Sequence, residues 1–172
     1  MSHAYPDPLA LSRRILRALT KLNLLMGSLI LALLIASLVA EAWVMKALGA
    51  GQGNSTLFLG MRLIMVLGIC TVPIVHVVLT RLLTIVETVG AGNPFVVANA
   101  ARLQGIAWAI LGLELMHFAV GIVAASVSTA AAPFDINWSF SPTRWVAVLL
   151  LFVLARVFEQ GARMREELEG TV

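Results

Sequence analysis

The chain has 172 residues, of which 60% are hydrophobic and only 12% charged, and its mean hydropathy is +0.95. Soluble domains carry about 25% charged residues, so this composition excludes a soluble enzyme and a disordered regulator. The single cysteine, Cys70, also excludes a disulfide-stapled secreted domain. The net charge of +3 comes from Lys and Arg spread between apolar runs. That distribution indicates membrane topology, with the lipid bilayer as first partner and no direct contact with nucleic acid.

Four apolar segments predict four transmembrane helices. A helix needs about 20 apolar residues to cross a bilayer. Segments 22–40 and 63–80 are uncharged, and the third apolar stretch is interrupted only by Glu114. The fourth, 145–155, is short and needs the arginines at its ends to snorkel or pair. The predicted fold is an all-α four-helix transmembrane bundle, one membrane domain with spans at residues 22–44, 57–80, 103–125 and 142–159.

The basic residues predict the orientation of these spans. Cytoplasmic flanks of membrane helices carry an excess of Lys and Arg. If segments 1–21, 81–102 and 160–172 are cytoplasmic, most basic residues lie inside, and only Lys46, Arg62 and Arg144 lie at or near the outside. We therefore expect both termini inside, an external loop at 126–141, and a bacterial inner membrane. A cleaved signal peptide is the alternative, but the first apolar run is longer than the 7–15 residues usual for one.

Segment 1–21 has the pattern of an amphipathic helix. Asp7 and Pro8 are typical of a helix start, and Arg13, Arg17 and Lys21 recur every fourth residue. We expect a short helix on the anionic inner leaflet that then turns into the membrane. The alternative is a basic flank of the first span with no further role.

Segment 81–102 contains a sharp turn before the third span. Gly90 and Gly92 are expected to end the second span in left-handed geometry. Asn93 is expected to cap the next helix, with Pro94 at its first position.

The tail 160–172 is expected to continue the fourth helix into the cytoplasm. Val157, Gly161, Met164 and Leu168 share one face at helical spacing. We expect this apolar face to cover the turn before the third span or to contact a partner.

Two segments resemble a known family. The turn reads PF-xxx-N-xx-RL, and the C-terminal segment contains a Val-Phe-x-x-Gly motif. Both are similar to the bacterial membrane-protein family of domain of unknown function 2975. The resemblance implies a four-span protein without established catalytic residues, and a helix-turn-helix regulator as a partner. The residues that we expect to matter for interaction or structure are Gly92, Asn93, Pro94, Phe95, Asn99, Arg102, Leu103, Arg156, Phe158, Gly161 and Glu167.

Glu114 and His117 are the candidates for chemistry inside the membrane. Their i,i+3 spacing places them on one helix face, and a carboxylate at that depth must be paired, protonated or near water. They form a metal-ligand pair, a proton relay or a polar gate, or else Glu114 hydrogen-bonds to His117 or to a Ser or Thr of another helix. A di-iron site fails because only one Glu-x-x-His motif is present. Haem ligation by His76 and His117 is disfavoured because their depths differ by about 15 Å.

Two arginines near the span ends allow further hypotheses. Arg62 is expected to snorkel outward, and Arg156 to snorkel, to pair with Glu159 or to form a tie to Glu87. Stripes of small residues permit close helix packing within the bundle or in a homo-oligomer. These stripes are Ser28, Ala32, Ala36 and Ala40, and Ala101, Gly105 and Ala109.

Three functions stay open from the sequence. The first is a non-enzymatic regulatory or scaffolding protein that binds a cytoplasmic or membrane partner through its inner face. The second is an accessory subunit of a larger membrane complex, and the third is a proton or metal pathway through Glu114 and His117. The sequence contains no nucleotide loop, zinc pattern, nucleophile elbow or Cys-x-x-Cys motif, so we expect neither an enzyme nor a cofactor.

Overall fold

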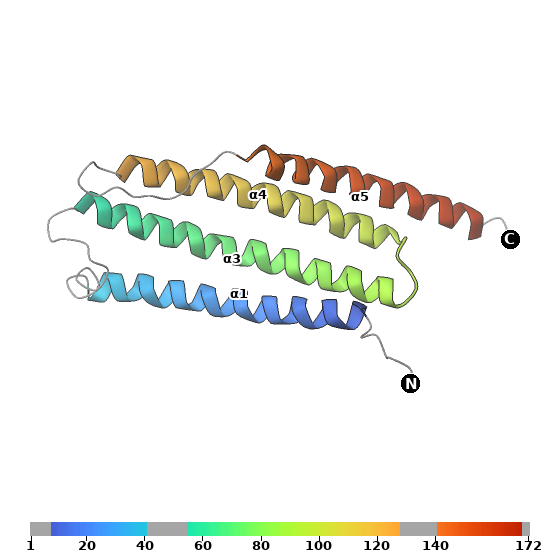
Figure 1. The fold of residues 1–172 in the computed structure, drawn as a ribbon, viewed down its shortest axis with the longest axis horizontal. Helices are drawn as coiled ribbons and strands as arrows, with labels where there is room; N and C mark the ends of the chain where they lie inside the picture. The colour runs from blue at the N-terminus through green and yellow to red at the C-terminus, as the bar shows by residue number, and fades with distance from the viewer. Residues whose placement is uncertain (1–7, 41–54, 128–140, 170–172) are drawn as a thin grey trace, which may run out of the picture.

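The computed structural model describes residues 8–40, 55–127 and 141–169. They form four α-helices, α1 (Pro8–Val39), α3 (Ser55–Gly90), α4 (Val97–Val127) and α5 (Pro142–Glu169) (Figure 1). Each helix is long and apolar enough to cross a membrane, and these ranges contain no strand. The predicted all-α, four-helix membrane architecture is confirmed. The predicted loop 126–141 lies almost wholly outside the described residues.

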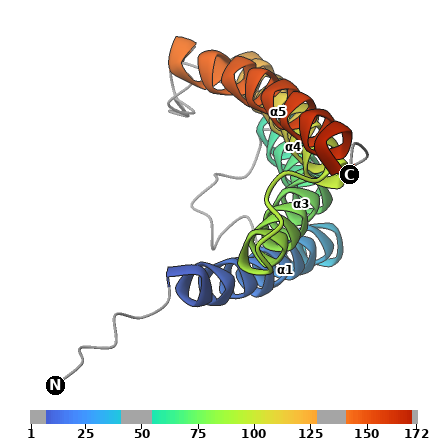
Figure 2. The same ribbon diagram turned by 90° about the vertical axis from the view of Figure 1, so that its right-hand side faces the viewer.

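The four helices form an open, curved layer. Each packs against its neighbour in the chain, and no Cα atom of α1 comes within 8 Å of α4 or α5. Seen along the helices, the layer bends into an arc with α1 at one edge and α5 at the other (Figure 2). In water such an arrangement would leave too much apolar surface exposed, whereas in a bilayer lipid chains cover the faces that no helix covers.

Glycines allow α1 and α4 to approach α3 closely. A Cβ atom added at Gly27 would lie 2.9 Å from methyl carbons of Val72, and one added at Gly60 would lie 2.5 Å from a methyl carbon of Val127. Helix association in lipid depends on such close van der Waals packing, because burying apolar surface gains little there. The two glycines therefore set the α1–α3 and α3–α4 contacts.

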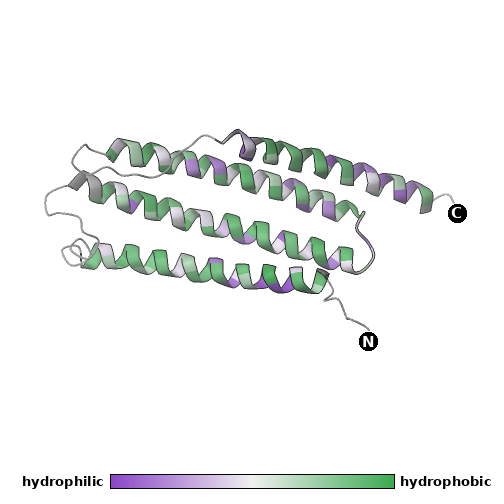
Figure 3. Ribbon diagram, viewed as in Figure 1, coloured by the Kyte–Doolittle hydropathy of each residue, from purple (hydrophilic) through white to green (hydrophobic). Residues whose placement is uncertain are grey.

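Two arginines of α3 mark the expected limits of the hydrocarbon layer. Arg62 donates a hydrogen bond of 2.6 Å to the carbonyl oxygen of Ser37, and the guanidinium of Arg81 lies against Gly105 of α4. Along α3 these two residues are separated by about 28 Å at 1.5 Å per residue, close to the hydrocarbon thickness of about 30 Å. Arg62 thus binds a neighbouring helix, which the expectation of outward snorkelling did not include. On α1 and α5 the hydrophilic colour gathers toward the end of the molecule where α3 and α4 are joined (Figure 3).

α5 is displaced lengthwise along α4. Its first turn places Arg144 3.7 Å from Glu114, in the middle of α4, and its last turns extend beyond the α3–α4 turn (Figure 1). We expected Arg144 near the outer ends of the helices. The physical reason for the difference is that the apolar part of α5 is shorter than α4, so it can lie along only part of α4. In that position the Arg144–Glu114 pair gives each charge a counter-ion.

The N-terminal segment does not turn at the start of the first span. α1 runs without a break from Pro8 to Val39, so the expected separate surface helix is wrong for the described residues. No Gly or Pro lies between Pro8 and Gly27 to interrupt the helix, and Arg17 pairs with Glu87 of α3 at 3.7 Å. Asp7 lies outside the described residues.

Candidate functional site

The turn between α3 and α4 follows the prediction in part. α3 ends at Gly90, and Gly92 has a φ of +80°, a conformation that favours glycine. The amide of Asn93 donates to the carbonyl oxygen of Thr88 at 3.1 Å, which closes the helix end. The expected role of Gly92 is therefore confirmed, but Gly90 is an ordinary helical residue without a positive φ.

α4 begins later than expected. Its first residue is Val97, so Pro94 is not the first helical residue and Asn93 is not the cap. The physical reason lies in the side chain of Asn93, whose Oδ1 accepts a hydrogen bond of 3.3 Å from Arg165 of α5. Residues 93–96 form a non-helical link instead.

Asn99 is the centre of a buried polar network in this turn. Its side chain is fully buried, and its Nδ2 donates to the Thr88 hydroxyl at 2.8 Å and to the Pro94 carbonyl oxygen at 2.9 Å. Arg102 donates to Asn99 Oδ1 at 2.7 Å. A buried amide that satisfies three partners joins the end of α3, the turn and α4 into one rigid unit.

Two phenylalanines join this turn to α5. The rings of Phe95 and Phe158 lie 5.3 Å apart between centroids, within the range of favourable aromatic pairs. A Cβ atom added at Gly161 would lie 3.1 Å from the ring of Phe95. The Phe95 ring therefore packs directly against the backbone of Gly161.

The residues of the two motifs thus meet at one end of the molecule. Through Phe95, Phe158, Gly161 and the Arg165–Asn93 hydrogen bond, the C-terminal helix is fixed to the turn. Leu103 is buried within the same region, with 7% of its surface exposed. We call residues 88–103 and 155–165 together the turn–tail unit.

The charged residues around this unit form other ion pairs than the Arg156–Glu87 pair considered from the sequence. Arg156 donates to Glu159 at 2.8 Å, and Arg163 donates to the other oxygen of Glu159 at 2.6 Å. Glu87 pairs with Arg17 of α1. The Arg156–Glu87 tie is therefore wrong, because α3 and α5 are separated by α4 and do not come into contact.

Only part of the predicted apolar face of the tail packs against the turn. Gly161 contacts the turn, but Val157, Met164 and Leu168 are exposed by 52%, 60% and 72%. Phe158 and Ala162 form the packed face instead, and Ala162 is 1% exposed. Of the two alternatives for the predicted face, contact with the turn holds for Gly161, and contact of the other three residues with a partner stays a prediction. Glu167 is exposed on the same part of α5.

Glu114 and His117 do not form a pair with each other. Glu114 lies next to Arg144, and its side chain is 15% exposed. Nε2 of His117 is buried without a hydrogen-bond partner in the described part of the chain. Because Arg81 contacts Gly105, these two residues lie at about the same depth along the helices. Counted from them at 1.5 Å per residue, the depths of His76 and His117 differ by about 10 Å. Residues 8–40, 55–127 and 141–169 contain no group of three His, Cys, Asp or Glu placed to share a metal ion.

Sequence reasoning missed three residues of these networks. Thr88 and Arg165 carry no local signal, because their partners are known only once the helix register is known. Arg144 had a detectable signal: it and Glu114 are opposite charges at or within apolar segments, and such charges are expected to pair.

The comparisons with known proteins identify one family. A family model described as "Protein of unknown function (DUF2975)" matches residues 45–172. The match includes α3, α4, α5 and both halves of the turn–tail unit, and it starts after α1. No curated protein and no solved structure matches the chain. Because the family model covers well over half of the sequence, the chain belongs to this DUF2975 family of membrane proteins.

Proposed function

We propose that this protein is a non-enzymatic regulatory or scaffolding protein of the bacterial inner membrane that binds a protein partner through the turn–tail unit. The observation that carries the proposal is the geometry of α5. Its inner face is fixed to the turn by Phe158 and Gly161, while Met164 and Leu168 extend beyond the turn with most of their surface exposed. A rigid unit that presents exposed apolar residues is a suitable interaction surface.

The distribution of charge supports a cytoplasmic position for this unit. The first turns of α1 contain four basic residues and the second half of α5 contains three, and both segments lie at the end of the molecule where α3 and α4 are joined (Figure 3). Basic residues near helix ends favour the cytoplasmic side. A partner that reaches the turn–tail unit is then a cytoplasmic protein or the cytoplasmic part of a membrane protein.

The tail also indicates how such a partner would bind. Val157, Met164 and Leu168 occupy one face of α5, and by helical spacing Arg165 and Glu167 flank this face. An amphipathic helix with spaced apolar anchors typically docks in an apolar groove or against another helix. A helix-turn-helix regulator, which the family resemblance implies, is one partner of this type.

Site-specific photocrosslinking in native membranes tests the proposal. A photoreactive residue is placed at Leu168, and a matched probe at Leu150, which is 58% exposed on the apolar part of the same helix. We expect the Leu168 probe to capture a defined protein that the Leu150 probe does not, and deletion of residues 164–172 to abolish its co-purification while membrane insertion persists. Identical products from both probes, or co-purification that survives the deletion, would contradict the proposal.

A specific observation on α1 favours a second function, that of an accessory subunit in a larger membrane complex. Of its small-residue stripe, Ser28, Ala32 and Ala40 are exposed, while the face toward α3 uses Gly27 and Ser37. This stripe is therefore available for close packing with another membrane helix. Cysteine crosslinking at Ala32 should then give a hetero-complex. A monodisperse small oligomer of this chain alone would contradict the function as an accessory subunit.

A further inference from the structure

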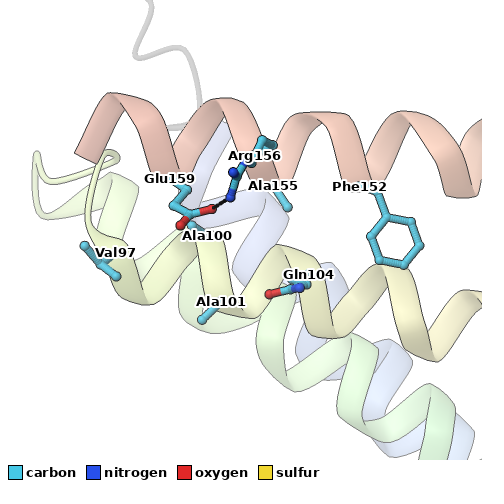
Figure 4. A pocket seen from close by; sticks show the side chains of 8 residues that line it. All are labelled: Val97, Ala100, Ala101, Gln104, Phe152, Ala155, Arg156 and Glu159. Atoms are coloured by element: carbon cyan, nitrogen blue, oxygen red, sulfur yellow. Dashed lines mark hydrogen bonds and ion pairs between the residues drawn. The ribbon is translucent and has the colours of Figure 1, made fainter. Parts of the chain in front are cut away.

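A groove follows one side of the contact between α4 and α5. Its first part is a pocket of about 210 Å³. Figure 4 shows the Arg156–Glu159 pair and Gln104 at this pocket, with Phe152 at its other end. Beyond Phe152 the groove opens out into a second part, a shallow apolar surface formed by residues of α5 alone. That second part is lined by Trp145, Val148, Leu149, Phe152, Val153 and Arg156.

The polar end of the groove presents a positive and a negative group side by side. Arg156 Nη1 lies 2.8 Å from Glu159 Oε2, and the side chains are 71% and 30% exposed. The other oxygen of Glu159 accepts a hydrogen bond of 2.6 Å from Arg163. A guanidinium has five N–H donors and each carboxylate oxygen has two lone pairs, so Arg156 and Glu159 can each bind a further molecule while all three groups stay paired. This end therefore suits a ligand that itself carries an anion and a cation close together.

The groove has the depth and direction of a phospholipid. Ala101 and Gln104, which line the polar end, lie within about one turn of Gly105. Gly105 contacts Arg81, which marks one expected limit of the hydrocarbon layer. From this level the apolar part leads along α5 toward Trp145, into the layer. A headgroup at Arg156 would then have its acyl chain in the apolar part.

We propose that this groove binds a phospholipid with an ethanolamine headgroup. The phosphate contacts the guanidinium of Arg156, the primary ammonium donates to the carboxylate of Glu159, and one acyl chain lies along Phe152 and Trp145. A purely anionic headgroup offers no ammonium group to the carboxylate of Glu159. A choline headgroup fits less well, because its quaternary nitrogen has no N–H to donate to the carboxylate.

A headgroup series on the unaltered protein is the first test. The full chain is purified in non-ionic detergent, stripped of lipid and incubated with equal amounts of phosphatidylethanolamine, its mono- and dimethylated forms, phosphatidylcholine and phosphatidylglycerol. Bound lipid is measured by native mass spectrometry. We expect retention to fall stepwise with methylation, by about tenfold from ethanolamine to choline, the change that loss of one charged hydrogen bond produces. Equal retention of these two, or strongest retention of phosphatidylglycerol, would overturn the proposal.

Two substitutions then assign the groups. Glu159→Gln should remove the preference for ethanolamine over choline, while Glu166→Gln, an exposed carboxylate on the same helix outside the groove, should preserve it. Arg156→Gln should weaken the binding of all the phospholipids, and Arg14→Gln, an exposed arginine of α1, should not. A loss of preference in Glu166→Gln, or a preference that persists in Glu159→Gln, would contradict the assignment. The headgroup series decides the proposal even if a variant does not fold.

Discussion

The buried amide of Asn99 offers the sharpest test of the turn–tail unit. Leucine has the same number and branching of side-chain heavy atoms as asparagine but is larger, so Asn99→Leu removes the hydrogen bonds without leaving a cavity. The substitution leaves the Pro94 carbonyl oxygen and the Arg102 guanidinium without this partner, and the Thr88 hydroxyl loses one donor.

The magnitude follows from these three hydrogen bonds. Two are neutral and contribute about 1 kcal/mol each, and the bond from Arg102 is charged and contributes about 2 kcal/mol. Arg102 is half-buried and regains some hydration when the bond is lost. The free energy of unfolding should therefore fall by about 3 kcal/mol.

Asn93→Leu is the matched control, because it makes the same change in the same turn. Asn93 is exposed and its side chain accepts one hydrogen bond of 3.3 Å from Arg165, so its loss should cost less than about 1 kcal/mol. Reversible unfolding by denaturing detergent, followed by tryptophan fluorescence, measures both variants. Equal destabilisation by the two substitutions, or no effect of Asn99→Leu, would refute the assigned role of the network.

Three further predictions concern helix contacts. Gly161→Leu should separate the two phenylalanine rings and speed tryptic cleavage of the tail by about tenfold, a loss of about 1.4 kcal/mol; an unchanged cleavage rate would contradict this contact. Arg144→Gln should destabilise the protein by about 3 kcal/mol because it leaves Glu114 without its counter-ion, and adding Glu114→Gln should restore most of the loss; additive effects in the double variant would argue against the pair. Gly60→Leu should cost about 2 kcal/mol by overpacking, whereas Gly112→Leu, with open space around it, should cost little; similar unfolding curves for both would exclude the proposed close approach.

Local sequence was sufficient for features that depend on one segment. The four helices follow from apolar length, and the left-handed Gly92 follows from the need to end α3 sharply before Pro94. The residues of the two motifs were also identified as important. Their contact with each other was not predicted, because two segments about 60 residues apart in the chain meet only after α4 and α5 adopt one particular register.

The register of α5 shows why the other features escaped prediction. The sequence predicts that the arginines at the ends of this short apolar run snorkel or pair, but it does not indicate a partner for Arg144 and places it near the outside. The structure instead shifts the helix until Arg144 reaches Glu114, because in lipid the apolar contacts between α4 and α5 change little with sliding while one ion pair favours a single position. The start of α4 was misplaced for a related reason, since Asn93 contacts α5 and does not cap its own helix.

The distribution of specific contacts gives a physical reason to place function at the turn. Near the opposite end of the layer, the described contacts are the Gly60–Val127 approach and the hydrogen bond from Arg62. The turn end combines the buried Asn99 network with aromatic packing onto α5. A partner or a lipid bound at the turn end therefore meets a preorganised surface and does not have to order it, which lowers the entropic cost of binding.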